Sequence, residues 1–304
     1  MTAIAESVGS FGVNKPVDVI KIINLINNND SYTGLEQPLP MSGLVDDSLI
    51  GAIKAFQTNH PSIRSARPDG RVDPGGKTLA CLDQYHNRAG RRVSYLPKGF
   101  DALTFGRFAI DAFIDLYRRQ YPVPGLGASA ELGLYDIVDR LIADADVTDI
   151  RWAAYMLATV KHECANTWMP IEEYGKGAGR DYGQVVSVDG PNNTKLQNTY
   201  YGRGFVQLTW DSNYKKMDTA LGLSGQGSLY LYPANALDAA TAYAVMSYGM
   251  RHGSFTGKKL SDYISGAQLD YRGARRIING HDQAALIAAY AANIEYLLRY
   301  CNGS

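Results

Sequence analysis

Three glutamates within one short stretch of the chain could carry out acid and base chemistry. Glu163 directly follows His162, and Glu172 and Glu173 follow Pro170. One protonated carboxyl can donate a proton to a leaving oxygen while an ionised carboxylate deprotonates an attacking water. In hydrolysis of this kind the two carboxyl groups stand about 6.5 to 9.5 Å apart. The residue types therefore suit a two-carboxylate hydrolytic site.

The residues before Glu163 predict a helix that would position it. Apolar side chains recur at spacings of three and four between Arg151 and Val160, which is typical of a buried helical face. Pro170 disfavours helical geometry in the residue before it, so the chain should turn before Glu172. A continuous helix would hold the carboxylates about 15 Å apart, whereas a turn can bring them closer. Solvated surface glutamates also occur at such spacings, so spacing alone leaves both interpretations open.

Two motifs give the stretch a family resemblance. The segments H-E-C-A-N-T-W-M-P-I-E-E-Y-G and Y-Y-G-R-G-F-V-Q-L-T-W-D-S-N-Y resemble the family 19 glycoside hydrolases, in the branch of bacteriophage endolysins and bacterial lytic enzymes. Plant chitinases are the better-known branch. The resemblance covers about the last two hundred residues in general pattern. It implies a mainly helical, lysozyme-like α+β catalytic domain that hydrolyses β-1,4 links between N-acetylated sugars with inversion.

The resemblance also implies roles for individual side chains. It places the general acid at Glu163 and the base in the P-I-E-E-Y-G segment. Related lytic enzymes often have Pro, an aliphatic residue, any residue and Glu here, which favours Glu173. Counting from the acid in other relatives gives Glu172, which stays as the alternative. Thr209 would help to hold the attacking water.

Further residues are implied at the substrate. Asn213 and Asn279 match positions that contact the acetamido sugar in the family, and Gln207 lies in the G-R-G-x-x-Q-L-T segment. His281 stands where the plant enzymes have a second glycine after Asn-Gly, so this wall of the cleft departs from the family pattern. The other candidate substrate-binding residues are His162, Tyr174, Tyr201 and Arg203.

The segment from Gly175 to Asn198 predicts a loop. Its glycines, proline and asparagines cannot form a regular helix, and a loop this long in a compact domain is usually functional. We expect it to form one wall of a cleft over the carboxylates. Tyrosines cluster around it, and aromatic faces suit the apolar face of a pyranose. Because the chain has 21 tyrosines, packing explains any single one equally well.

The N-terminal part predicts a small three-helix domain. Helical patterns run from Val17 to Asn27 and through D-D-S-L-I-G-A-I-K-A-F-Q, where Asp46 or Asp47 would be the cap, and a third helix follows P-D-G-R-V-D-P. The marks A-I-x-x-F-Q and D-G-R-V-D-P-x-x-x-T-L-x-x-L resemble the peptidoglycan-binding domain of lytic enzymes. Its expected ligand edge is Asp69, Gly70, Arg71 and Asp73, although a simple tight turn at D-G carries equal weight.

These patterns predict two domains in a mainly α protein. The small wall-binding domain would span residues 1–84, a polar and basic linker 85–100, and the larger catalytic domain 101–304. In the catalytic domain we expect an amphipathic helix over residues 101–120, another over 131–145, and largely helical structure after Tyr214.

Composition and spacing exclude several other functions. The net charge is zero, which gives no electrostatic case for nucleic acid or an anionic membrane. An H-E-x-x-H zinc motif would need a histidine where Asn166 stands, and the five histidines show no ligand spacing, so we expect no metal and no cofactor. Cys164 lies at the end of a helix, where the dipole disfavours a thiolate nucleophile.

The remaining expectations concern the partner and the place of action. The N-terminus lacks the basic and apolar regions of a signal peptide, and no run of apolar residues is long enough to span a bilayer. Three widely spaced cysteines fit a chain made in a reducing cytoplasm. We therefore expect a monomer that is made in the host cytoplasm and acts on bacterial peptidoglycan after release. Chitin hydrolysis, stem-peptide cleavage and wall binding without catalysis are the alternatives.

Overall fold

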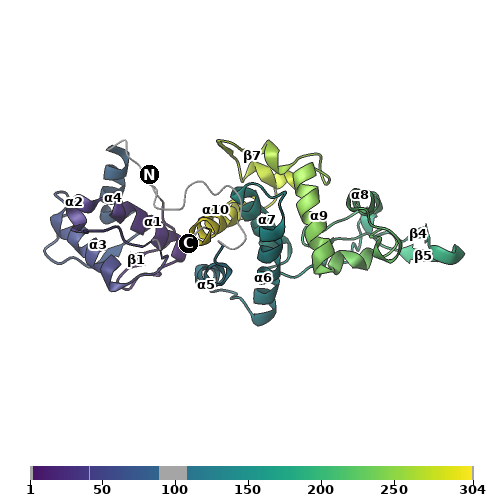
Figure 1. Cartoon of the computed structure of the whole chain (residues 1–304), viewed down its shortest axis with the longest axis horizontal. Helices are drawn as coiled ribbons and strands as arrows, with labels where there is room; N and C mark the ends of the chain where they lie inside the picture. Colours follow the sequence, from purple (N-terminus) through teal and green to yellow (C-terminus); the bar gives the residue numbers. More distant parts are fainter. Residues whose placement is uncertain (1–2, 41, 89–107, 303–304) are drawn as a thin grey trace. The chain divides into compact units, whose positions relative to one another are not determined.

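The computed structural model describes residues 3–40, 42–88 and 108–302, and it is mainly helical, as predicted (Figure 1). Strands in the described part are short and occur as antiparallel pairs. The contacts divide the chain into two compact units. The first contains the N-terminal elements, residues 111–125 and the end of the chain from Arg299. The second contains the residues from Leu126 to Leu298.

The first unit contains the predicted N-terminal helices. Its elements are β1 (Val8–Gly9), α1 (Pro16–Asn27), α2 (Asp30–Thr33), α3 (Asp47–Asn59), β2 (Arg71–Val72), α4 (Lys77–Arg88) and most of α5 (Ile110–Gln120). Helix α1 begins with a proline, which suits the first helical position, and most of its residues are buried. Of the two expected caps of α3, it is Asp46 whose side chain accepts the Leu49 amide, at 2.8 Å. Strand β1 pairs with β2 in antiparallel register.

Helix α5 differs from the prediction in both extent and grouping. Phe108 and Ala109 precede the helix, so the predicted helix over 101–120 is wrong in its start, and residues 101–107 lie outside the described part. The side-chain oxygen of Gln120 accepts the Val17 amide at 3.0 Å, and Lys15 donates to the Gln120 carbonyl. These bonds attach the segment to α1, whereas the sequence placed it in the catalytic domain. Most of the predicted linker 85–100 is outside the described residues.

The second unit is built around α7, which carries Glu163. Its α-helices are α6 (Ala128–Ala143), α7 (Ile150–Glu163), α8 (Asp211–Leu221), α9 (Ala239–His252) and most of α10 (Ala284–Cys301). The Asp149 side chain caps α7 by accepting the Arg151 amide at 2.9 Å. Every residue from Ala153 to Lys161 is buried, because the other elements of this unit surround the helix. A helix buried this completely gives Glu163 a fixed starting point.

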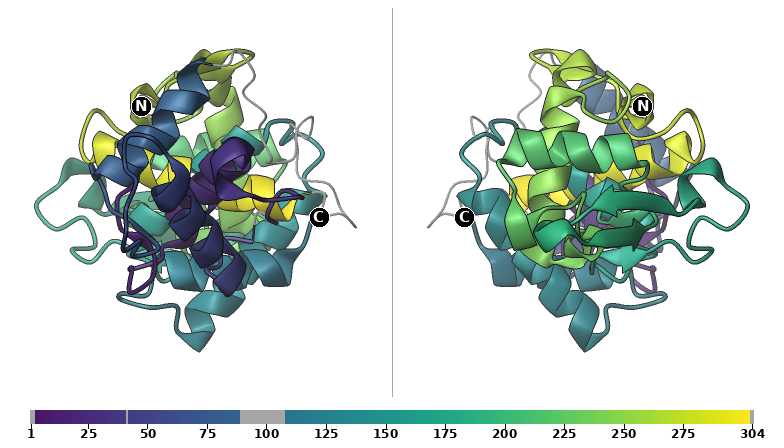
Figure 2. Two further views of the ribbon diagram at one scale, coloured as in Figure 1. Left: turned by 90° about the vertical axis from the view of Figure 1, so that its left-hand side faces the viewer. Right: turned by 90° about the vertical axis from the view of Figure 1, so that its right-hand side faces the viewer.

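Short strands and 3-10 turns complete the second unit. The strand pairs are β3 (Ile171–Glu172) with β6 (Arg203–Gly204), β4 (Val186–Asp189) with β5 (Lys195–Asn198), and β7 (Ile264–Ser265) with β8 (Gln268–Leu269). The segment predicted as a loop over 175–198 has no α-helix, but it contains the β4–β5 hairpin, which extends past α8 (Figures 1 and 2). None of the described helices combines the length and the apolar character needed to cross a bilayer.

Candidate active site

The turn after α7 separates Glu163 from the other two glutamates, as predicted. Ala165, Asn166 and Trp168 have φ values of 49°, 63° and 57°, in the left-handed region. For a residue other than glycine this conformation costs on the order of 1 to 3 kcal/mol. The Trp168 side chain is only 1% exposed, so burial of a large aromatic group offsets part of that cost. The strained turn reverses the chain within a few residues.

Cys164 fixes this turn against the β3–β6 pair. Its buried thiol lies 3.7 Å from the carbonyl oxygens of both Gly204 and Phe205. Ile171 pairs with Gly204, and Glu172 pairs with Arg203. The end of α7 and the strand that carries Glu172 therefore meet at β6. Burial raises the pKa of the Cys164 thiol, which keeps it protonated and agrees with its exclusion as a nucleophile.

Glu163 is paired with an arginine that the sequence did not single out. The Arg275 guanidinium donates to the Glu163 carboxylate at 2.5 Å, and the two side chains are 3% and 15% exposed. Arg275 lies on the 3-10 turn η6 (Gly273–Ile277), and its Nε donates to the Asp282 carbonyl. The segment R-R-I-I-N-G drew attention to Asn279 alone, although a buried carboxylate at a helix end requires a partner.

Tyr155 borders the same ion pair from within α7. Its ring is fully buried and stacks on Tyr271 with 5.9 Å between ring centroids. Burial raises the pKa of Tyr155; the charge of Arg275 opposes this shift and that of Glu163 adds to it. The Tyr155 hydroxyl therefore stays protonated and neutral beside the pair.

Glu172 is held by several donors on the exposed face of the strand pair. The Tyr201 hydroxyl donates to it at 2.6 Å, the Lys176 ammonium lies at 3.2 Å, and the Arg203 guanidinium lies at 3.5 Å. The Tyr201 hydrogen bond, followed by that of Lys176, lowers the pKa of Glu172. Because these groups favour the charged form, Glu172 is ionised at neutral pH.

Glu173 has a different environment from its neighbour. One carboxylate oxygen accepts the Tyr182 hydroxyl at 2.9 Å, and the other accepts the Gly202 amide at 3.1 Å. Its backbone amide also donates to the Gly202 carbonyl, at 2.8 Å. Glu173 is thus held by the Tyr182 side chain and by the backbone just before β6.

An aromatic pair stands beside Glu173. Tyr182, from the 3-10 turn η1 (Asp181–Gly183), packs edge-on against Trp210 with 5.6 Å between ring centroids. Burial is the main cause that raises the pKa of Tyr182, and the hydrogen bond to Glu173 raises it further. Trp210 is 44% exposed and has a φ of 70°. The sequence noted Tyr182 in a tyrosine cluster without a role and passed over Trp210.

Three of the predicted substrate residues have structural partners. Arg203 is buried, lies over the Tyr201 ring at 3.6 Å, and donates to the Thr199 carbonyl. The Gln207 amide donates to the carbonyls of Ile171 and Gly204, so it braces the β3–β6 pair. Tyr201 and Arg203 both contact Glu172, and Gln207 contacts the strand that carries it.

The other predicted residues are more accessible. Asn213 donates to the Thr209 carbonyl at 3.0 Å, which fixes the backbone of Thr209 at the start of α8. Asn279 is exposed just after η6, the element that carries Arg275. His162 is half-buried beside Glu163, and Tyr174 is 88% exposed.

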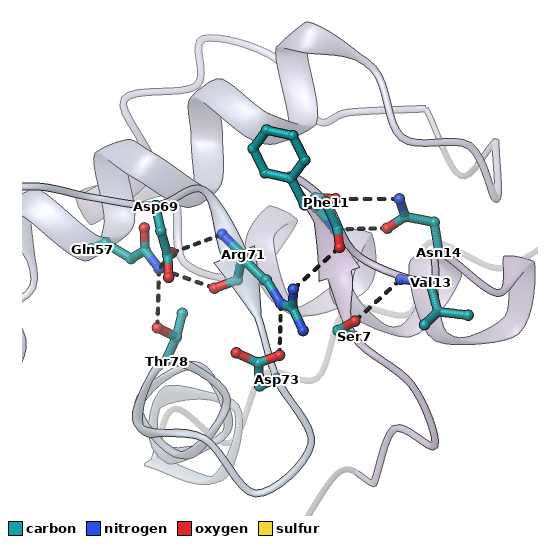
Figure 3. A network of polar contacts seen from close by, with 10 residues as sticks. Ser7, Phe11, Val13, Asn14, Gln57, Asp69, Arg71, Asp73 and Thr78 are labelled. Atoms are coloured by element: carbon teal, nitrogen blue, oxygen red, sulfur yellow. Dashed lines mark hydrogen bonds and ion pairs between the residues drawn. The ribbon is translucent and has the colours of Figure 1, made fainter.

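The predicted wall-binding edge lies in the first unit and is drawn in Figure 3. Asp69 accepts the Gln57 amide at 2.6 Å and the Arg71 backbone amide at 2.9 Å. Gly70 is buried with a φ of 70°, so it is required by the turn. Arg71 and Asp73 form an exposed ion pair at 2.7 Å. The edge therefore combines a structural turn with two accessible charged groups.

No metal site adds to these groups in the described part of the chain, where no three His, Cys, Asp or Glu side chains gather in a suitable cluster. The chemistry available at the glutamates is proton transfer by carboxyl groups, supported by an arginine and two tyrosine hydroxyls.

Comparisons with known proteins give only distant likenesses. No protein-family profile and no curated protein matches the chain. The structure is similar to that of chitinase C from Streptomyces griseus HUT6037, with a TM-score of 0.40 and 22% identity, over 66% of this chain and 80% of that chain. It is also similar to a glutamate-to-glutamine mutant of chitinase C, with a TM-score of 0.38 and 19% identity, over 68% of this chain and 97% of that chain. Likenesses at these scores do not establish a family.

Proposed function

We propose that this chain is a glycoside hydrolase that cleaves β-1,4 bonds between N-acetylmuramic acid and N-acetylglucosamine in peptidoglycan, with inversion. The observation that carries the proposal is the junction of α7 with the β3–β6 pair. Glu163 pairs with Arg275, Glu172 accepts the Tyr201 hydroxyl, and Glu173 accepts the Tyr182 hydroxyl, so each carboxylate has different partners. Carboxyl groups in contrasting environments are what separate acid and base roles in glycosidases.

Glu163 acts as the general acid in this proposal. It protonates the glycosidic oxygen, and the carboxylate that remains is then stabilised by Arg275 at 2.5 Å. The same pairing favours the ionised form before the reaction, so in the proposed cycle Glu163 must take up a proton before it donates one. The 15% exposure of the Glu163 side chain leaves it accessible to take up a proton for the next cycle.

Glu173 acts as the base, with Glu172 as the alternative. A carboxylate offers about four acceptor sites. The acceptor sites of the Glu172 carboxylate face a tyrosine, a lysine and an arginine. The Glu173 carboxylate accepts one hydroxyl and one backbone amide. Glu173 therefore has more capacity left to bind a water, and the Thr209 hydroxyl is proposed to orient that water. Glu172 instead keeps the buried side chains of Tyr201 and Arg203 in place.

The substrate class rests on the N-terminal unit. The catalytic motif suits both chitin and peptidoglycan, and a chitinase is the alternative glycosidase. The resemblance of the N-terminal helices to a peptidoglycan-binding domain favours the bacterial wall. We propose that the chain acts on the wall as a monomer after release from the cytoplasm in which it is made. The modular endolysin role belongs to the same proposal.

Digestion of purified bacterial wall tests the reaction. We expect release of reducing sugars without free amines, and mass spectrometry of the fragments should show cleavage after N-acetylmuramic acid. Free amines would identify a stem-peptide amidase or peptidase instead. Wall binding without any soluble product would identify a non-catalytic binding protein, and faster release from chitin than from wall would identify a chitinase.

Replacement of the acid tests the assignment of Glu163. Glu163→Gln keeps the side-chain shape and a hydrogen bond to Arg275 but removes the transferable proton, so we expect reducing-sugar release to fall by at least about a thousandfold. Glu36→Gln, at an exposed glutamate of the first unit, is the matched control and should retain full activity. Circular dichroism should show that both variants fold. A folded Glu163→Gln protein with normal activity would exclude Glu163 as the acid.

A further inference from the structure

The loop between Ser10 and Asn14 in the first unit presents an aromatic ring to solvent. Phe11 is 100% exposed, and Val13, two residues later, is 57% exposed. Single exposed apolar residues are common on protein surfaces, so exposure by itself assigns no role. What distinguishes Phe11 is the combination of its backbone conformation with the hydrogen bonds that hold the loop.

Phe11 occupies a position that its own packing does not explain. Its φ is 55°, in the left-handed region where glycine and asparagine are favoured and a bulky aromatic residue is unusual. Asn14 has a similar φ of 58°, but its side chain accepts the Gly9 amide at 2.8 Å and donates to the Gly9 carbonyl, which accounts for it. The Phe11 ring is fully exposed and offers no such compensation. A strained residue without a structural benefit points to a function.

Hydrogen bonds hold the backbone of this loop in place. Ser7 accepts the Val13 amide at 3.1 Å, and Arg71 donates to the Phe11 carbonyl at 3.1 Å. Arg71 is itself fixed by Asp73, at 2.7 Å. Figure 3 shows the Phe11 ring directed away from its carbonyl oxygen and from these bonds. Because the backbone is already held, only the side-chain torsions of Phe11 lose conformational entropy when the ring binds a ligand.

We propose that Phe11 is a stacking platform for a sugar ring of the peptidoglycan glycan strand, an inference that rests on the proposed function. An aromatic face complements the C–H face of a pyranose. The adjacent charged groups, Arg71 and Asp73, are paired with each other, so the ring offers an apolar surface rather than a site for a charged ligand. Arg71 is then a positioning residue, because it holds the Phe11 backbone.

Binding of the full-length chain to purified wall tests this platform. The chain carries Glu163→Gln so that the wall stays intact, and bound protein is measured by cosedimentation. We expect Phe11→Gly to weaken binding at least about tenfold, or about 1.4 kcal/mol. Its unfolding temperature should not fall, because glycine suits a φ of 55°. Phe11→Trp should retain binding, and so should the matched control Leu44→Ala, at an apolar residue that is 42% exposed.

Competition identifies the ligand. Glycan strands stripped of stem peptides should displace the bound chain, and free stem peptides should not. Equal binding by Phe11→Gly and the parent would overturn the platform, and displacement by stem peptides alone would overturn its assignment to a sugar. Reducing-sugar release by the chain with Glu163 intact is measured in parallel. If the chain with Glu163 intact releases reducing sugars normally and Phe11→Gly binds the wall as well as the parent, only the platform is rejected. If that chain releases no reducing sugars, the proposed function is rejected.

Discussion

The side chains of Glu172 and Glu173 show how adjacent carboxylates can differ in role. Glu172 contacts the cations of Lys176 and Arg203, and Glu173 accepts a tyrosine hydroxyl and a backbone amide. Consecutive residues of an extended strand point to opposite faces, which is why the two carboxylates have different neighbours. At most one of them can therefore face the reacting bond.

Comparison of the two amide variants identifies the base. We expect Glu173→Gln to lower the rate of wall hydrolysis by at least about a hundredfold, since in the proposed mechanism Glu173 deprotonates the water. Glu172→Gln removes an ionic partner of Arg203 and should act mainly on stability. Rates and urea unfolding curves of both variants check this. A larger rate loss in Glu172→Gln would transfer the role to Glu172, and equal small losses would remove the base from this segment.

The hydroxyl of Tyr201 gives a second test at the level of one side chain. Its hydrogen bond is the largest cause of the lowered pKa of Glu172, so Tyr201→Phe should raise that pKa toward its ordinary value. A carboxylate whose pKa is lowered by folding stabilises the protein above its unfolded pKa, and this contribution disappears as the pH falls through the folded pKa. The variant should therefore lose stability at neutral pH and approach the parent at acidic pH.

Carbon NMR titration of the Glu172 carboxyl, assigned through Glu172→Gln, measures the shift directly. Thermal unfolding of Tyr201→Phe and the parent between pH 3 and pH 7, about the range over which a glutamate titrates, gives the linked change in stability. An unchanged titration curve would show that the hydrogen bond does not govern the charge of Glu172.

The sequence located the glutamates but not their partners. The helical period before Glu163 and the proline at position 170 predict a helix and then a turn, because these signals are local. Arg275 was missed because it comes from a distant 3-10 turn, and nothing in its immediate sequence indicates which carboxylate it contacts. Tyr201 and Arg203 were predicted to bind substrate, and the structure shows that both side chains are buried and contact Glu172. Burial depends on tertiary packing that a short motif does not contain.

At the scale of elements, the turn between α7 and β3 sets the position of Glu163. Ala165, Asn166 and Trp168 adopt positive φ there, and none of them is glycine. Local propensity would not choose this conformation, so the packing of Trp168 and the Cys164 contacts must impose it. This is why the sequence predicted only that the chain turns, and not how sharply.

Relief of backbone strain tests this view of the turn. Ala165 is exposed with a φ of 49°, so Ala165→Gly should stabilise the protein by about 0.5 to 1 kcal/mol, the gain from strain exceeding the entropy cost of glycine. The control is Ala289→Gly, at an exposed position within α10, which should destabilise by about 1 kcal/mol. Urea unfolding of the two variants measures both values. Equal destabilisation by both would show that the turn is not strained at Ala165.

Helices α1 and α3 of the first unit were easier to predict than the β4–β5 hairpin of the second unit. Helices α1 and α3 follow from strong apolar periods and a capping aspartate. The β4–β5 hairpin was not predicted, because the run from Gly175 to Asn198 is dominated by residues that signal turns. Val186 and Val188 do alternate with polar residues in β4, but the strand has only four residues and β5 has one apolar residue, so the pattern is too short to predict a hairpin.

At the scale of the whole molecule, two units with separate cores should respond separately to core damage. Ile53 in α3 and Ile137 in α6 are both fully buried, one in each unit. Replacement of a buried isoleucine by alanine costs about 2 to 5 kcal/mol. We expect calorimetry to show two unfolding transitions, with Ile53→Ala lowering one and Ile137→Ala lowering the other. A single transition lowered equally by both variants would mean that the chain unfolds as one cooperative body.

The attachment of α5 to α1 determines where functional modules could be exchanged. The Gln120 side chain supplies an acceptor for the first turn of α1, and Leu116 lies against the chain at Gly43. A chimaera joined at residue 100, where the amino-acid pattern suggests a domain boundary, would remove both contacts from the first unit and leave a buried amide unsatisfied. Recombination of such modules, in the laboratory or by gene shuffling, should therefore keep residues 111–125 with the N-terminal helices.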